Sequence, residues 1–123
     1  MNVIEDVQKA MKELVQSTVV AKVELKIAYC ESFKIGKTGQ TKDERFAGYK
    51  GEYEEYSIVY EGSRKEVSDM ESYLIKHYKD NPKCDNYRGP KASNKDEMKE
   101  DSVNFHVYVV WNRANNADKT GHK

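Results

Sequence analysis

Glu71 is the charged residue whose place in the sequence most needs a chemical explanation. At roughly 100° per residue, it falls on one helical arc with five apolar side chains: Val67, Met70, Leu74, Ile75 and Tyr78. A carboxylate on a buried face is costly unless a metal, a cation or a hydrogen-bond donor compensates it. Glu71 is therefore either a ligand for Mg²⁺ or Mn²⁺, which prefer oxygen ligands, or a residue at the rim of the core that is paired with Lys or Arg.

Arg45 and Tyr49 form a second candidate pair, because residues four apart lie on one face of a helix. Phe46 points elsewhere, toward the core. A guanidinium beside a phenol suits a phosphate group that gains charge in a transition state. The same spacing also fits a solvent-exposed helix face, so the pair alone leaves both interpretations open.

The Gly-Lys-Thr at 36–38 is similar to the end of a nucleotide-binding P-loop, but the beginning of that motif is absent. A P-loop needs a glycine five residues before its second glycine, and this chain has Glu31 there. A carboxylate in that place would repel phosphate. The sequence therefore excludes a nucleotide-binding loop of this type.

Three helices are predicted around these residues. Capping boxes at Thr41 and at Ser63 predict helices over about 42–49 and 63–78, which carry the Arg45–Tyr49 pair and Glu71. Apolar residues at i, i+3, i+4 and i+7 predict an earlier amphipathic helix over 3–15, which we expect to pack on a sheet.

Strands should supply that sheet. Alternating β-branched residues predict a strand over 18–29, joined by a short turn to a strand over 33–36 as an antiparallel hairpin. Further strands are predicted over 56–60 and 103–111. The order of elements predicts an α+β fold, with a small, mostly antiparallel sheet of about three to four strands flanked by helices.

The length and composition fit one small domain. We expect it to span residues 1–111, with a long polar loop over 83–102 and a disordered tail over 112–123. The chain has no apolar run long enough to cross a bilayer, and its acidic start is unlike a secretory leader. These features predict a cytoplasmic protein, or one in the compartment where its genome is copied, with reduced thiols at Cys30 and Cys84.

The charge balance gives a mixed indication about nucleic acid. The 21 basic and 21 acidic residues cancel, whereas nucleic-acid binders usually carry net positive charge. Residues 26–50, however, hold more basic than acidic side chains. This local excess coincides with the segment that carries the Gly-Lys-Thr and the Arg45–Tyr49 pair.

Taken in order, the motifs between about Leu25 and Tyr87 resemble those of the GIY-YIG nuclease superfamily. Its phage- and virus-associated branch has the Lys-Ile-Gly form seen at 34–36. In that family a β-hairpin carries two motifs, which here correspond to Ile-Ala-Tyr at 27–29 and Lys-Ile-Gly-Lys-Thr at 34–38. A helix then supplies an Arg and a His or Tyr, and a later helix supplies a metal-binding Glu. Two departures are Ile27 in place of glycine, and Lys34 where many members have Tyr.

The resemblance implies a divalent-metal-dependent endonuclease with a one-metal site. It assigns Glu71 to binding Mg²⁺ or Mn²⁺, and four residues to catalysis: Tyr29, Lys34, Arg45 and Tyr49. Tyr29 would orient or deprotonate the attacking water, helped by Lys34 or Lys37, while Arg45 would stabilise the phosphate charge. The residues expected to contact nucleic acid are Lys37, Lys42, Asn86, Arg88 and Lys91.

The implied partner is nucleic acid, DNA in preference to RNA, bound by a monomer or a weak homodimer with no membrane association. Two alternatives stay open. One is a GIY-YIG-like module that binds nucleic acid without cutting it. The other is a small interaction protein with no nucleic-acid role, which the zero net charge permits.

Overall fold

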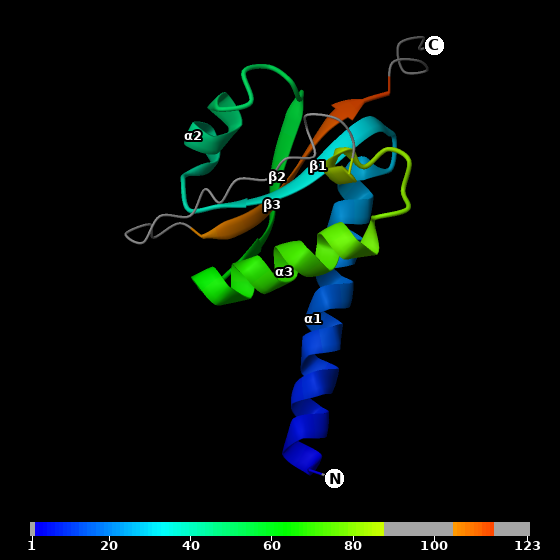
Figure 1. Cartoon of the computed structure of the whole chain (residues 1–123), viewed down its shortest axis with the longest axis vertical. Helices are drawn as coiled ribbons and strands as arrows, with labels where there is room; N and C mark the ends of the chain where they lie inside the picture. The colour runs from blue at the N-terminus through cyan, green and yellow to red at the C-terminus, as the bar shows by residue number, and fades with distance from the viewer. Residues whose placement is uncertain (1, 88–104, 115–123) are drawn as a thin grey trace.

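A three-stranded antiparallel sheet, in the order β1-β3-β2, forms the centre of the described structure. The computed structural model describes residues 2–87 and 105–114. Its elements, shown in Figure 1, are α1 (Val3–Ile27), β1 (Cys30–Thr38), α2 (Lys42–Ala47), β2 (Glu55–Glu61), α3 (Arg64–His77), the 3₁₀ helix η1 (Asp85–Tyr87) and β3 (His106–Arg113). Three strands and three α-helices within these residues confirm the predicted α+β fold.

The two faces of the sheet are covered by different elements. On one face, α1 and α3 pack against apolar side chains that include Phe33, Ile35, Val59, Val107 and Val109. On the other face, an aromatic cluster forms beside α2 and the turn that follows it: Tyr49, Tyr53, Tyr56 and Tyr108, with Val110. Because successive strand residues point to opposite faces, Lys34 and Gly36 share the second face with Tyr108.

The predicted strand over 18–29, and its hairpin with 33–36, are wrong. Residues 18–27 instead continue α1 as a single helix, whose buried residues Val19, Val23 and Ile27 are spaced four apart. A spacing of four residues is typical of one face of a helix, and it also fits the alternation of a strand, in which every second residue points the same way. Asn2 caps the start of α1, no Gly or Pro interrupts it, and extending a formed helix costs less than starting a new element.

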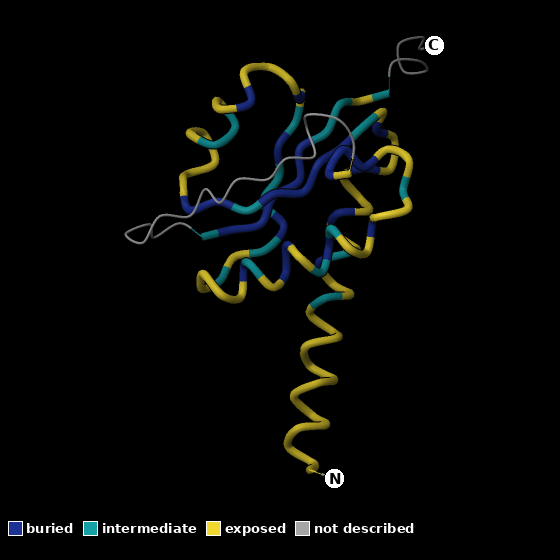
Figure 2. Tube along the Cα trace, in the orientation of Figure 1, coloured by how far each residue is buried: buried dark blue, intermediate teal, exposed yellow. Residues whose placement is uncertain are grey.

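The prediction that residues 3–15 pack on the sheet is also wrong. Their large apolar side chains, Val3, Ile4, Val7, Met11, Leu14 and Val15, are between 42% and 73% exposed. Figure 2 shows this half of α1 as an exposed arm that extends away from the sheet. Continuation of the helix through Ile27 moves the core contacts to its C-terminal half, which leaves the first half without a sheet to cover.

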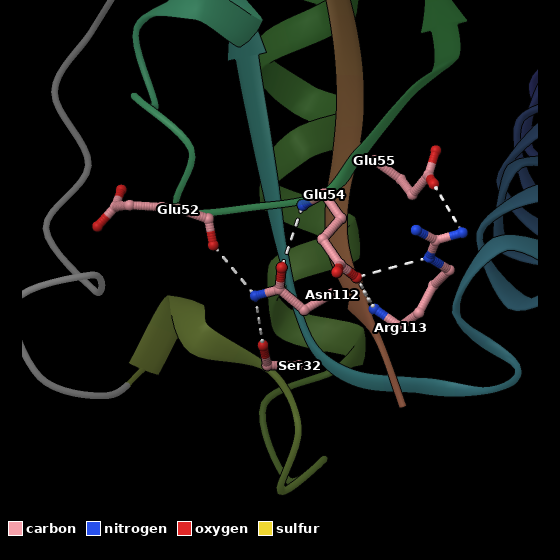
Figure 3. Close-up of polar contacts among 6 residues, drawn as sticks. All are labelled: Ser32, Glu52, Glu54, Glu55, Asn112 and Arg113. Atoms are coloured by element: carbon pink, nitrogen blue, oxygen red, sulfur yellow. Dashed lines mark hydrogen bonds and ion pairs between the residues drawn. The ribbon is translucent and has the colours of Figure 1, made fainter. Parts of the chain in front are cut away.

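The end of β3 is tied to the start of β2, as Figure 3 shows. The side chain of Asn112 accepts a hydrogen bond from the Glu54 N–H and donates one to the Glu52 carbonyl. Arg113 lies 3.6 Å from carboxylate oxygens of Glu54 and Glu55. The predicted tail at 112–123 therefore begins too early, because its first two residues belong to β3; residues 115–123 lie outside the described residues.

The predicted loop over 83–102 is described only at its start. Its first residues include η1, which contacts β1. Residues 88–104 lie outside the described part of the chain. Within the described ranges, no helix is both long enough and apolar enough to cross a membrane.

Candidate active site

Arg45 and Tyr49 meet at the end of α2. A capping box between Thr41 and Glu44 fixes the start of this helix, which ends at Ala47 and not at Tyr49 as predicted. The Arg45 guanidinium lies 4.4 Å from the centre of the Tyr49 ring, and its Nη2 donates a hydrogen bond of 3.3 Å to the Tyr49 hydroxyl. Cation–π attraction and the hydrogen bond together hold the guanidinium against the ring.

Tyr108, on β3, is a member of this group that sequence reasoning missed. Its hydroxyl lies 2.6 Å from that of Tyr49, and its ring centre lies 5.6 Å from the Arg45 guanidinium carbon. In the sheet it pairs with Gly36, and a Cβ on that glycine would lie 2.3 Å from the Tyr108 hydroxyl. Gly36 of the Lys-Ile-Gly motif therefore makes room for this phenol. The available signal was the alternation of β3, which places polar-tipped rings on one face.

Lys34 brings a second cation to the same face. It is 8% exposed, and its Nζ lies 5.9 Å from the centre of the Tyr49 ring. Burial, followed by the nearby Arg45 charge, lowers the pKa of Lys34 below the ordinary 10.5, while the carboxylates of Glu52, Asp85 and Glu71 oppose this shift. The charges of Arg45 on α2 and of Glu71 on α3 therefore both act on the Lys34 ammonium.

Burial holds two of the phenols at this face in their protonated form. Burial raises the pKa of Tyr108 above the ordinary tyrosine value, and it does the same for Tyr56. The two rings stack with centres 4.7 Å apart, and the Tyr56 hydroxyl lies 2.7 Å from Nε2 of His106. Tyr108 can therefore donate or accept a hydrogen bond, but it is poorly suited to act as a phenolate base.

Glu71 lies on the inner face of α3, as its helical position predicted, and is 8% exposed. Its Oε1 is 3.8 Å from Nζ of Lys37, which also donates a hydrogen bond of 3.3 Å to Oγ of Ser68. This is the kind of ion pair that a structural role for Glu71 requires. Lys37, predicted to contact nucleic acid, thus faces α3.

A metal at Glu71 would have at most one further His, Cys, Asp or Glu ligand among the described residues. Among the described residues, no three His, Cys, Asp or Glu side chains are grouped so that they could hold a metal ion. Mg²⁺ fits a site of this kind, because it is commonly bound by one or two carboxylates together with substrate phosphates and water. The residues present therefore match a metal that arrives with a phosphate substrate.

Tyr29 is not brought to the other predicted catalytic residues. It lies between α1 and β1 and is 86% exposed, and its carbonyl accepts a hydrogen bond from the Ala114 N–H. Lys34 lies five residues further along, which corresponds to about 16 Å of extended strand. The hairpin that would have placed Tyr29 beside the Lys-Ile-Gly motif does not form.

Asn86 has its amide engaged with the backbone of β1. Its Oδ1 accepts a hydrogen bond from the Ile35 N–H and its Nδ2 donates one to the Ile35 carbonyl, both at 2.8 Å. The buried side chain thus acts like a neighbouring strand and fixes η1 against β1. This contact gives Asn86 a positioning role, and its contact with nucleic acid stays a prediction.

The remaining predicted contacts with nucleic acid are basic residues. Lys42 is exposed and lines, with Thr41 and His106, a cavity of about 350 Å³ beside α2. Arg88 and Lys91 lie outside the described residues.

Comparison of the chain with protein-family models, with curated proteins and with solved structures finds no match. The candidate site therefore rests on the geometry of its residues and on the resemblance of their motifs.

Proposed function

We propose that this chain is a divalent-metal-dependent endonuclease that hydrolyses phosphodiester bonds in nucleic acid, DNA in preference to RNA, through a GIY-YIG-type site. The observation that carries the proposal is the convergence of Lys34, Arg45 and Tyr49 on one face of the sheet. The motif resemblance assigned these three residues to catalysis from the sequence alone. Two cations beside two phenols form a site suited to an anionic phosphate.

Tyr108 takes the part that the resemblance gave to Tyr29. In the family, the first motif lies on the strand that pairs with the Lys-Ile-Gly strand; here β3 is that neighbour, and Tyr108 lies opposite Gly36. Because Tyr108 is 1% exposed, its raised pKa and its hydrogen bond to the Tyr49 hydroxyl suit it to orient the nucleophile through Tyr49. The proton of the attacking water would have to pass to another acceptor.

Arg45 and Lys34 supply the positive charge. Arg45 is half-buried, and its planar donors match two phosphate oxygens. Lys34 is more deeply buried and adds a second positive charge close to the Tyr49 ring. Glu71 would hold Mg²⁺ or Mn²⁺, which would polarise the scissile phosphate and stabilise the leaving oxygen.

A second function is favoured by one observation. The Lys37 ammonium lies 3.8 Å from the Glu71 carboxylate and reduces the negative charge that a metal would meet. A chain in which this ion pair is permanent would keep the basic face and lose catalysis. It would then bind nucleic acid without cutting it.

Incubation of supercoiled plasmid with the protein and Mg²⁺ or Mn²⁺ tests the proposal. We expect relaxed product with metal, none with a chelator, and none with Glu71→Gln. Asp69→Asn is the matched control, because it removes a carboxylate from the exposed side of the same helix. Thermal melting should show that Glu71→Gln keeps its fold, because glutamine has nearly the shape of glutamate and its amide oxygen can still accept a hydrogen bond.

The outcomes separate the two functions. Full cleavage by Glu71→Gln would remove the metal assignment. Absence of cleavage by the wild-type chain, together with a gel shift at low salt, would establish the binding module in place of the nuclease.

A further inference from the structure

An apolar stripe runs along the exposed side of α1. Its positions alternate in steps of three and four residues: Ile4, Val7, Met11, Leu14, Thr18, Ala21 and Leu25. The five large side chains among them are between 51% and 80% exposed. Alternating steps of three and four are the heptad spacing by which α-helices pair along a seam.

The sheet does not cover this stripe. The buried residues of α1 are Val19, Val23 and Ile27, and at roughly 100° per residue they point to the side opposite the stripe. The first half of the helix extends beyond the sheet altogether (Figure 2). An isolated helix as short as this projecting half is only marginally stable in water, so contact along the stripe would stabilise it.

The rest of this chain offers little to cover the stripe. Residues 88–104 and 115–123 contain only two apolar side chains larger than proline, Met98 and Val103. Two such side chains are too few to cover the seven positions of the stripe. The occupant is therefore to be sought in another molecule.

The charges of α1 favour a second copy of the same helix. Uncharged residues flank the first half of the stripe on both sides: Val3, Gln8, Ala10, Val15 and Ser17. Two identical helices can therefore approach without repulsion between like charges, which flanking positions otherwise impose. The charged side of this half carries three acids and two lysines, and this composition does not favour an anionic lipid surface.

We propose that the stripe of α1 is a homodimerisation surface, along which α1 of one copy pairs with α1 of a second. Residues 4–25 give a seam of about 30 Å. Burying a whole aliphatic side chain removes roughly 60–120 Å² from water, so five partly exposed ones offer on the order of 300 Å² per copy. This is well below the roughly 800 Å² per partner of a standard interface, so the dimer is weak and forms as concentration rises.

Sedimentation equilibrium of the full chain, from about 1 µM to about 1 mM, tests the proposal. The average mass of the wild-type chain should rise from 14.2 kDa toward twice that value. Leu14→Lys, and separately Met11→Lys, should stay monomeric throughout. Glu13→Lys is the matched control, because it places the same side chain in the same turn but on the charged side, and it should dimerise like the wild type.

A wild-type chain that stays monomeric would overturn the proposal, as would equal losses in Leu14→Lys and Glu13→Lys. Circular dichroism should show that all variants keep their fold, since the substituted residues are exposed. A chain that is monomeric in buffer but sediments with vesicles of anionic phospholipid would assign the stripe to a membrane surface instead. No readout depends on cleavage, so the result is independent of whether the chain cuts nucleic acid.

Discussion

Two tyrosines compete for one role at the candidate active site. The Tyr108 hydroxyl lies 2.6 Å from that of Tyr49, whereas Tyr29 is 86% exposed at the start of β1. Tyr108→Phe keeps the ring but removes the hydroxyl, so we expect cleavage to fall by about 100-fold. Unfolding free energy should drop by only about 1 kcal/mol.

Tyr29→Phe is the comparison, and it should cut like the wild type. Initial rates of plasmid cleavage and thermal melts of both variants provide the measurement. The reverse pattern, an inactive Tyr29→Phe and an active Tyr108→Phe, would return the role to the tyrosine that the motif resemblance first indicated.

The residues predicted correctly to lie together are those whose proximity depends on local structure. Arg45 and Tyr49 meet because they are four residues apart, and the burial of Glu71 follows from the periodicity of α3. Tyr108 contacts Tyr49 across 59 residues. That contact depends on which strand pairs with β1, and no local pattern in the sequence determines that pairing.

At the scale of elements, α1 offers a direct test of helix against strand. Val23 is fully buried and Leu25 is 80% exposed, although a strand would place both on the same face. Val23→Ala should lower the unfolding free energy by about 1–3 kcal/mol. Leu25→Ala should change it by less than about 0.5 kcal/mol. Chemical denaturation of the two variants distinguishes the structures, because a strand predicts similar losses at both positions.

The error over 18–29 has a physical origin. Val19, Val23 and Ile27 satisfy a period of two and a spacing of four at the same time, so alternation alone does not separate strand from helix. The helix forms over these residues because they directly continue the helix that Asn2 caps. The predictions for α2 and α3 succeeded because each begins at a capping box, which both structure and sequence contain.

For the whole molecule, the buried phenols predict loss of stability at alkaline pH. Burial is the main cause that raises the pKa of the four buried tyrosines Tyr53, Tyr56, Tyr78 and Tyr108. In the unfolded chain these phenols ionise near pH 10. Above that pH the unfolded chain binds fewer protons than the folded one, so the free energy of unfolding falls as pH rises.

Each of these tyrosines should remove about 1.4 kcal/mol of stability per pH unit above that point. Lys34 acts in the opposite direction, because its lowered pKa makes the folded chain the one with fewer protons, but it is one group against four. Thermal melts between about pH 8 and pH 12, with tyrosinate absorbance, provide the measurement. Ionisation of all tyrosines near pH 10 without a fall in melting temperature would contradict this account.

The arrangement of layers was predictable because it follows from the kinds of element present. The order of the strands was not predictable. The last strand in the sequence, β3, lies in the middle of the sheet between β1 and β2, and no local pattern indicates this place. The candidate site depends on that order. It uses β1, α2 and β3, with Glu71 on α3 near enough to the edge strand β1 to pair with Lys37 and to act on the charge of Lys34.

The most direct test of the proposed nuclease site is the initial rate of metal-dependent plasmid cleavage by the wild type, Arg45→Ala and Lys42→Ala. Arg45 contacts both Tyr49 and Tyr108, whereas Lys42 is an exposed cation one turn earlier on α2. Loss of the guanidinium should slow cleavage by about 100-fold or more, while loss of Lys42 should have a much smaller effect. Equal losses at both positions, or no cleavage by the wild-type chain, would contradict the assignment of the site.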